Sequence, residues 1–293
     1  MNPRNLTFAL IFLSVIVSGI RVTPVLANTP DSVTRLRLLI PLYIYPTWWD
    51  PETYQWDEIA EAQSQIPTTA IINPNNGPGG NCPNADYQEG LRALRDAGVT
   101  ILGYVYTDYA RRDIGEVKGE IDQYSNTCFD IDGIFLDGVS NKVSNIGYYQ
   151  ELYTYVRSLP DLDCVFLNPG ARTHELYLNV SDTIVIFEDY SINWPEYEPD
   201  DYVAAYAAER FAILGHTLLD TEPLVEYTNL AVERNIGHIY LTDDIMPNPW
   251  DDLPSFFDTL LTAMAPKSNP VPEPIALFLF GVGLTGVFVS RGR

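Results

Sequence analysis

Residues 133–140 read GIFLDGVS, in which an apolar run is followed by the carboxylate of Asp137, and this stretch decides how the rest of the chain is interpreted. Similar runs flank this stretch on both sides, TILGYVYT at residues 100–107 and CVFLNPG at residues 164–170. Continuous apolar segments of this length are expected for parallel strands that are covered on both faces. We therefore predict a parallel β-sheet built from segments of this kind.

Further runs of the same type extend the sheet in both directions along the chain, at residues 38–46, 69–75, 183–190, 211–217 and 238–244. Helical patterns separate many of them, at residues 87–97, 148–158, 224–235 and 251–264, and Gly98 is placed to end the first. Residues 191–199 are rich in Trp, Pro and Tyr and are predicted to form a long loop. Eight strand–helix units in about 230 residues predict a single-domain α/β fold, the (β/α)8 TIM barrel.

An open, doubly wound sheet is the alternative fold. That fold normally carries a glycine-rich nucleotide-binding turn after its first strand. Here the first predicted strand is followed by TWW at residues 47–49. The closed barrel is therefore the better prediction.

The N-terminal residues have the pattern of a signal peptide. An apolar run at residues 6–20 follows Arg4, and Val25-Leu26-Ala27 offers a small-residue cleavage site. We predict a signal peptide at residues 1–27, followed by the barrel domain at residues 28–268. An uncleaved N-terminal anchor is the alternative. Under either interpretation the barrel domain is exported.

The C-terminal residues 269–293 combine three features in order. Pro272-Glu273-Pro274 precedes a mostly apolar run at residues 275–289, and a basic tail ends the chain. This order resembles the PEP-CTERM sorting signal of bacterial envelope proteins. The resemblance implies recognition by an exosortase, transient membrane association, removal of the tail and delivery to the cell surface or beyond. A plain C-terminal membrane anchor is the alternative.

The charge of the chain narrows the choice of partners. The formal net charge is −22, and because the two terminal segments contribute +3, residues 28–268 carry about −25. Such a surface repels phosphate backbones, so nucleic acid is excluded as a partner. It suits neutral or cationic ligands, although the acidic residues can equally serve only to keep the domain in solution.

Three cysteines leave an odd count. Cys128 and Cys164 precede neighbouring predicted strands at the same end of the barrel, so we expect a disulfide between them in an exported protein. Cys82 would then be unpaired, and three free thiols are the alternative. No metal site or cofactor is predicted, because no cysteine spacing suggests zinc and the histidines are scattered at positions 174, 216 and 238.

Barrel enzymes place their active sites at the carboxyl ends of the strands. The predicted strand ends carry carboxylates, amides, phenols and one imidazole, which are groups that hydrogen-bond sugar hydroxyls. The candidate substrate-binding residues are Tyr43, Tyr45, Asn73, Asn75, Tyr106, Asp108, Asn168, Asp189, Trp194, His216 and Asp243. Trp48, Trp49 and Trp194 are candidates for stacking on the apolar face of a sugar ring. A wall position for His216 and a solvated loop position for the acids are the alternatives.

Cleavage of a glycosidic bond requires two carboxyl groups, one protonated and the other ionised. Asp137 and Glu188 come from the fourth and sixth predicted strands, which lie two apart in the barrel, so their side chains are expected to reach one cavity. A separation of about 5 Å would imply retention of the anomeric configuration, and a larger one inversion. The stretch NPNNGPGG at residues 73–80 is a tight turn whose glycines would also allow a ligand to approach the backbone.

Six strings in order, IPLYIYP, AIINPNNGPG, GYVYTDYARR, IDGIFLDGVSN, VFLNPG and VIFEDY, resemble the spherulation-specific family 4 (spherulin-4-like) proteins. The resemblance runs from about Leu39 to Asp244. It implies a (β/α)8 barrel related to glycoside hydrolases that act on α-1,4-linked N-acetylgalactosamine or galactosaminogalactan polymers. A cationic, partly deacetylated polymer of this type would suit the acidic surface.

Carried over residue by residue, the catalytic aspartate of the family falls on Asp137 and its glutamate on Glu188. The resemblance then implies Asp137 as nucleophile or stabiliser and Glu188 as general acid. The family tends to have an Asp-Glu pair after the fourth strand, and this chain has Gly138 as the second member. An exported hydrolase of amino-sugar exopolysaccharide is therefore the main hypothesis. A non-catalytic polysaccharide-binding or matrix protein on the same barrel is the alternative.

Overall fold

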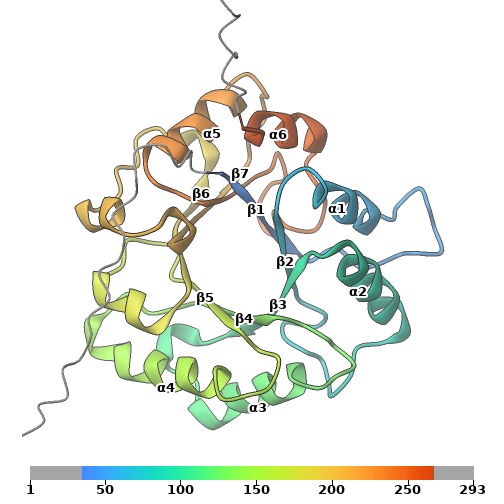
Figure 1. Cartoon of the computed structure of the whole chain (residues 1–293), viewed down its shortest axis with the longest axis vertical. Coiled ribbons are helices and arrows are strands. Elements are labelled where there is room, and N and C mark those ends of the chain that lie inside the picture. The colour runs from blue at the N-terminus through green and yellow to red at the C-terminus, as the bar shows by residue number, and fades with distance from the viewer. Residues whose placement is uncertain (1–34, 267–293) are drawn as a thin grey trace, which may run out of the picture. The chain divides into compact units, whose positions relative to one another are not determined.

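A computed structural model describes residues 35–266 and confirms the predicted closed barrel (Figure 1). Eight parallel strands pair in chain order, and β8 closes the ring by pairing with β1. The strands are β1 Arg37–Leu42, β2 Thr68–Ile72, β3 Thr100–Tyr106, β4 Gly133–Asp137, β5 Cys164–Asn168, β6 Thr183–Tyr190, β7 Phe211–His216 and β8 His238–Leu241.

Helices cover the outside of this ring (Figure 1). They are α1 Trp56–Ala62, α2 Ala85–Ala97, α3 Ile114–Tyr124, α4 Ile146–Val156, α5 Leu224–Glu233 and α6 Phe257–Met264. Asn84 caps the start of α2 by accepting a hydrogen bond from the backbone of Tyr87, and Gly98 ends that helix in a left-handed conformation, as predicted. Short 3-10 turns replace α-helices after β5 and β6, which agrees with the loop predicted for residues 191–199.

Strand registers set the height of each side chain in the barrel. Tyr106 on β3 pairs with Asp137 on β4, which pairs with Asn168 on β5, so three polar residues lie at one level of adjacent strands. Lower in the barrel, the Phe166 and His238 rings meet from β5 and β8 at 5.4 Å and fill the interior. Polar groups thus gather where the strands end, above a packed core.

A β-bulge interrupts the pairing of β6 with β7. Val185 pairs with Ala212, but the next pair joins Phe187 to Ile213, which leaves one extra residue in β6. A bulge of this kind changes which of the following side chains point inward, and bulges are common beside active sites. Glu188 follows the bulge after one residue, Phe187.

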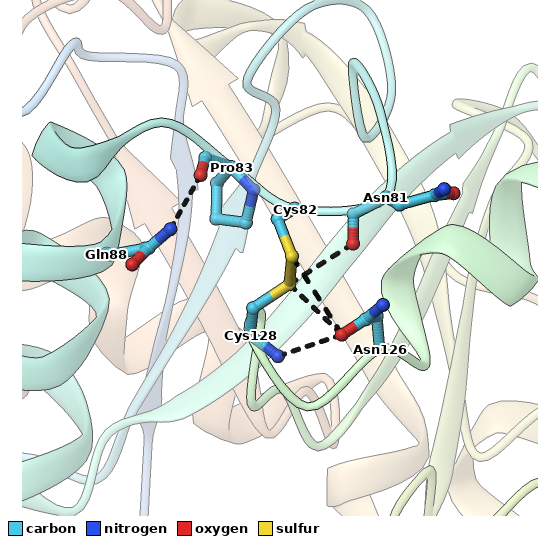
Figure 2. The surroundings of a disulfide bond; sticks show 6 residues. All are labelled: Asn81, Cys82, Pro83, Gln88, Asn126 and Cys128. Carbon is cyan, nitrogen blue, oxygen red and sulfur yellow. Dashed lines mark hydrogen bonds between the residues drawn. A yellow bond between two sulfur atoms is a disulfide. The ribbon is translucent and has the colours of Figure 1, made fainter.

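The disulfide prediction is wrong, because Cys82 bonds to Cys128 and leaves Cys164 as the free thiol (Figure 2). Strand β2 ends at Ile72, which pairs with Gly103 halfway along β3, so the following loop leaves the barrel early. The loop then runs past α3, where a Cβ on Gly77 would lie 3.6 Å from Glu120 Oε2.

This path takes Cys82 out to the segment between α3 and β4, which carries Cys128. Asn81 O, from the loop that carries Cys82, lies 3.1 Å from Cys128 Sγ, which shows how closely the two segments pack (Figure 2). Cys164 remains at the start of β5, where burial raises the pKa of its thiol to about 12. Strand order alone does not reveal such a detour of a loop.

The predicted signal peptide at residues 1–27 and the predicted sorting segment at residues 269–293 lie outside the described residues. Within residues 35–266, the helices are too short or too polar to cross a membrane.

Candidate active site

One amide joins the two predicted catalytic carboxyl groups. Asn168 Nδ2 donates hydrogen bonds to Asp137 Oδ1 at 2.8 Å and to Glu188 Oε2 at 2.6 Å. Because both oxygens contact the same nitrogen, they lie no farther apart than the sum of these two distances, 5.4 Å. Asp137 and Glu188 are both partly exposed, whereas Asn168 is buried. The structure therefore brings the two acids together at the end of the barrel, within reach of solvent.

The orientation of the Asn168 amide is fixed from its other side. Its Oδ1 accepts a hydrogen bond from the backbone N–H of Gly170 at 2.9 Å. If the amide were reversed, its oxygen would face two carboxyl groups and its NH2 would face an N–H donor, which is unfavourable on both sides. The two N–H bonds of Asn168 are thus used by Asp137 and Glu188, and Asn168 positions the carboxyl groups rather than offering a donor to substrate.

Two tyrosines line the Asp137 side of the site. The Tyr104 hydroxyl donates to Asp137 Oδ2 at 2.8 Å, and the Tyr43 ring packs edge-on against Tyr104 with centroids 5.6 Å apart. Burial, followed by the negative charge of Asp137, raises the pKa of both phenols, so both remain protonated donors. Tyr43 was predicted to lie in the site, whereas Tyr104 was not among the predicted residues. It lies two residues before Tyr106, on the same face of β3, and strand alternation is the signal that points to it.

The environments of the two acids differ. Burial raises the pKa of Glu188 to about 7, the nearby charge of Asp137 adds to this effect, and only the Asn168 amide opposes it. Burial also raises the pKa of Asp137, but hydrogen bonds from Tyr104, the Gly138 backbone and Asn168 favour its ionised form. Among the described residues, no basic side chain lies within 4.0 Å of either carboxyl group. Near neutral pH the pair can therefore hold one proton, on Glu188.

Gly138 is required at its position by its surroundings. Its backbone has a φ of +56°, and a Cβ there would lie 2.3 Å from Tyr106 Cε2. Thr107 binds the backbone of this turn through its hydroxyl, which donates to the carbonyl groups of Asp137 and Gly138. In this structure the Tyr106 ring occupies the space that a second carboxylate after β4 would enter.

Several other predicted residues are engaged in local structure. Asn73 Oδ1 accepts from the Gly77 backbone, and the Asp243 carboxylate accepts from the backbone of Ser255. Asp189 accepts hydrogen bonds from the backbone of Tyr190 and from the side chain of Asn193. Each contact stabilises the turn that follows a strand.

The remaining predicted residues lie at the last positions of strands or on the loops that follow them. Tyr106 donates to Asp108, whose carboxylate also pairs with Arg111 at 2.6 Å. Asn75 is exposed in the turn after β2. His216 is a buried wall residue whose ring lies 4.6 Å from that of Tyr190, and burial lowers its pKa.

The prediction that Trp194 stacks on a sugar is wrong, because its ring is fully buried. The indole N–H donates to the backbone of Tyr227, the Tyr197 ring stacks on it at 5.9 Å, and Arg234 lies over its face at 4.8 Å. Trp194 is a core residue of the loop after β6. Tyr45, Trp48 and Trp49, in contrast, are exposed after β1.

No group of three or more His, Cys, Asp or Glu residues within the described part of the chain is arranged to hold a metal ion. The reactive groups that the structure brings together at the strand ends are the two carboxyl groups and the phenols beside them. These features define a class of protein, the (β/α)8 barrels that carry a pair of carboxyl groups at their strand ends.

Within that class, the chain belongs to spherulation-specific family 4, whose family model matches residues 37–264. Spherulin-4 of Physarum polycephalum is 32% identical over 223 residues, which are 73% of this chain. The chain spans only 65% of the length of that relative. Sph3 of Aspergillus clavatus, solved as a crystal structure in complex with GalNAc, has a similar fold. It superimposes with a TM-score of 0.69 at 24% identity, over 80% of this chain and 98% of Sph3.

Proposed function

We propose that the chain is an exported glycoside hydrolase that cleaves an amino-sugar-containing exopolysaccharide of the N-acetylgalactosamine type. The observation that carries the proposal is the single amide of Asn168 bridging Asp137 and Glu188, which holds two acids in different environments at one place. The substrate class is supported by the family and by Sph3, which was solved with GalNAc bound. The excess of acidic residues in the chain favours polymers that carry some free, cationic amino groups.

The spacing of the acids supports a retaining mechanism. Carboxyl groups about 5–5.5 Å apart suit a nucleophile and an acid/base, whereas inverting enzymes need room for a water molecule between them. In the proposed first step, Asp137 attacks the anomeric carbon while Glu188 donates its proton to the departing sugar oxygen. In the second step, Glu188 takes a proton from water, which attacks the same carbon and releases Asp137. Tyr104 would hold Asp137 in position throughout.

A catalytic assay tests the proposal directly. We expect the full-length protein to release oligosaccharides from a galactosaminogalactan-type polymer, and Asp137→Asn and Glu188→Gln each to lower the rate by at least about a thousandfold. Asp189→Asn is the matched control, since Asp189 is the neighbouring acid and binds Tyr190 and Asn193 instead. Equal release by the wild type and both active-site variants would remove the assignment.

The alternative is a non-catalytic glycan-binding protein on the same barrel. It is favoured by Gly138, where the Tyr106 ring takes the space of the second carboxylate that the family resemblance implies. Binding without cleavage across acetylated and deacetylated polymers would support this alternative.

The export part of the proposal is supported by the disulfide between Cys82 and Cys128, since disulfides persist mainly in oxidising compartments. We further propose that residues 269–293 direct an exosortase-type sorting step with transient membrane association. Fractionation of cells that produce the full-length chain, with and without residues 269–293, tests this. An unchanged intracellular location of both forms would contradict it.

A further inference from the structure

A second surface of the barrel has the properties of a glycan-binding site. An open pocket of about 310 Å³ lies where the loop after β1 meets α1 and α2. Its lining residues are Trp48, Pro51, Tyr54, Asp57, Glu89 and Ala93. Its size falls at the lower end of the range for small-ligand pockets, about 300–1,000 Å³. None of the lining residues belongs to the Asp137–Glu188 site.

The aromatic wall of this pocket is exposed and yet held in place. Trp48 is 50% exposed, and its ring packs edge-to-face, 5.9 Å away, on the ring of Trp49, which is similarly exposed but does not line the pocket. Asp86, in the first turn of α2, accepts hydrogen bonds from the Trp48 indole at 3.1 Å and from the Tyr45 hydroxyl at 2.6 Å. Holding large aromatic rings rigid in solvent contributes little to folding, but it lowers the entropy cost of binding a ligand.

The opposite side of the pocket is acidic. Asp57 belongs to α1, whose charged residues are all acidic, whereas Glu89 on α2 is already paired with Arg92 at 2.6 Å. Asp57 is therefore the carboxylate that remains for a ligand. Burial and then the charges of Asp57 and Glu89 raise the pKa of the Tyr54 phenol to about 12, so Tyr54 presents a hydroxyl donor beside these acids.

An aromatic face, a hydroxyl and a carboxylate that has no ion-pair partner among residues 35–266 surround one pocket, and they match the groups of an amino sugar. The apolar face of a sugar ring packs on indole, hydroxyl groups bond to the phenol and carboxylates, and a free ammonium group pairs with a carboxylate. A neutral apolar ligand would leave Asp57 desolvated, and an anionic ligand would be repelled by both acids.

We propose that this pocket is an accessory binding site for a segment of amino-sugar polymer that carries free amino groups. The proposal rests on the proposed function for the identity of the polymer. The site would hold the polymer on the barrel independently of the reacting bond, with Trp48 as the stacking platform and Asp57 as the partner of the ammonium group.

Binding can be measured without cleavage in the Glu188→Gln background of the full-length protein. The probes are one galactosamine polymer in two forms, fully N-acetylated and partly deacetylated, and affinity electrophoresis gives the dissociation constants. We expect Trp48→Ala to weaken binding of both forms by about tenfold. Asp57→Asn should weaken binding of the deacetylated form several-fold and leave the acetylated form within about twofold.

Two matched controls lie beside the site. Trp49→Ala removes an indole of similar exposure that does not line the pocket, and Glu61→Gln removes a negative charge from α1 outside it. Each control should change the dissociation constant less than about twofold. Equal losses in Trp48→Ala and Trp49→Ala, or in Asp57→Asn and Glu61→Gln, would overturn the proposal.

The outcome is separable from that of the hydrolase assay. If the wild type cleaves the polymer and Trp48→Ala binds as tightly as its parent, the accessory site is refuted and the hydrolase stands. If no cleavage occurs but binding depends on Trp48 and Asp57, the hydrolase proposal fails and the binding site stands.

Discussion

Replacing Glu188 by glutamine should stabilise the fold at alkaline pH, because the wild-type side chain is held in a place that disfavours its charge. Burial and the charge of Asp137 raise the pKa of Glu188 to about 7 from an ordinary value of 4.5. The unfolded chain loses this proton near pH 4.5, whereas the folded protein keeps it until about pH 7. The stabilisation that comes from the raised pKa of Glu188 is therefore fully present below pH 4.5, and it is lost as the pH rises to 7.

The size of the effect follows from the same values. Each pH unit between the two pKa values is worth about 1.4 kcal/mol, so the loss reaches about 3 kcal/mol above pH 7. Glutamine retains an oxygen that accepts the Asn168 hydrogen bond and has no proton to lose. The free energy of unfolding of Glu188→Gln relative to the wild type should therefore increase by about 3 kcal/mol between pH 4.5 and pH 8.

Urea unfolding of both proteins at several pH values measures this difference. Comparing the change with pH, rather than the value at one pH, removes any constant effect of the substitution. Glu233→Gln, an exposed glutamate at the end of α5, is the control for loss of one negative charge. A difference between Glu188→Gln and the wild type that stays constant across this pH range would refute the reasoning.

Three further predictions concern the frame around the site. Replacing Cys82 or Cys128 by serine removes the disulfide, which joins residues 46 positions apart in the sequence. Urea unfolding should then show a free energy of unfolding that is lower by up to about 4 kcal/mol. Gly138→Ala should lower the free energy of unfolding by about 2–4 kcal/mol in the same assay, because position 138 has a positive φ and an added Cβ would meet the Tyr106 ring. Adding Tyr106→Ala in a double variant should recover part of this loss. Trp194→Ala should lower the free energy of unfolding by about 3–5 kcal/mol, as expected for the loss of a buried indole. A decrease of less than about 1 kcal/mol would contradict the burial of Trp194 in the core.

The fold was predictable because the strand signal repeats. Six predicted strands begin at the observed residue, and β6 agrees at both ends. The others were predicted to end one to four residues too late, since the chain stays apolar or aromatic where it turns outward, as at residues 43–46 after β1. The helices α1 and α3 were not predicted; α1 is short and shows only Trp56, Ile59 and Ala62 as its buried face.

The site was predictable in its residue types but only partly in its geometry. Asp137 and Asn168 end β4 and β5, Glu188 lies two residues before the end of β6, and the (β/α)8 fold brings such strand ends together. The roles within the set depend on details that the sequence does not contain. Gly170 orients the Asn168 amide through a backbone contact, and a bulge in β6 precedes Glu188.

The two errors have a common physical cause. Cys82 reaches Cys128 because a loop leaves β2 early, and Trp194 is buried because Arg234 and Tyr197 cover its ring. Both depend on the path of a long loop through the layer outside the barrel. Residue type and strand order carry no information about such paths.

The central claim is that Glu188 holds a proton near neutral pH because it is buried, and because the negative charge of Asp137 lies beside it. NMR titration of the Glu188 carboxyl carbon in the full-length protein measures this directly. The account predicts a midpoint near pH 7 in the wild type and a lower midpoint in Asp137→Asn, where the neighbouring charge is gone. A midpoint near 4.5 in both proteins would contradict it.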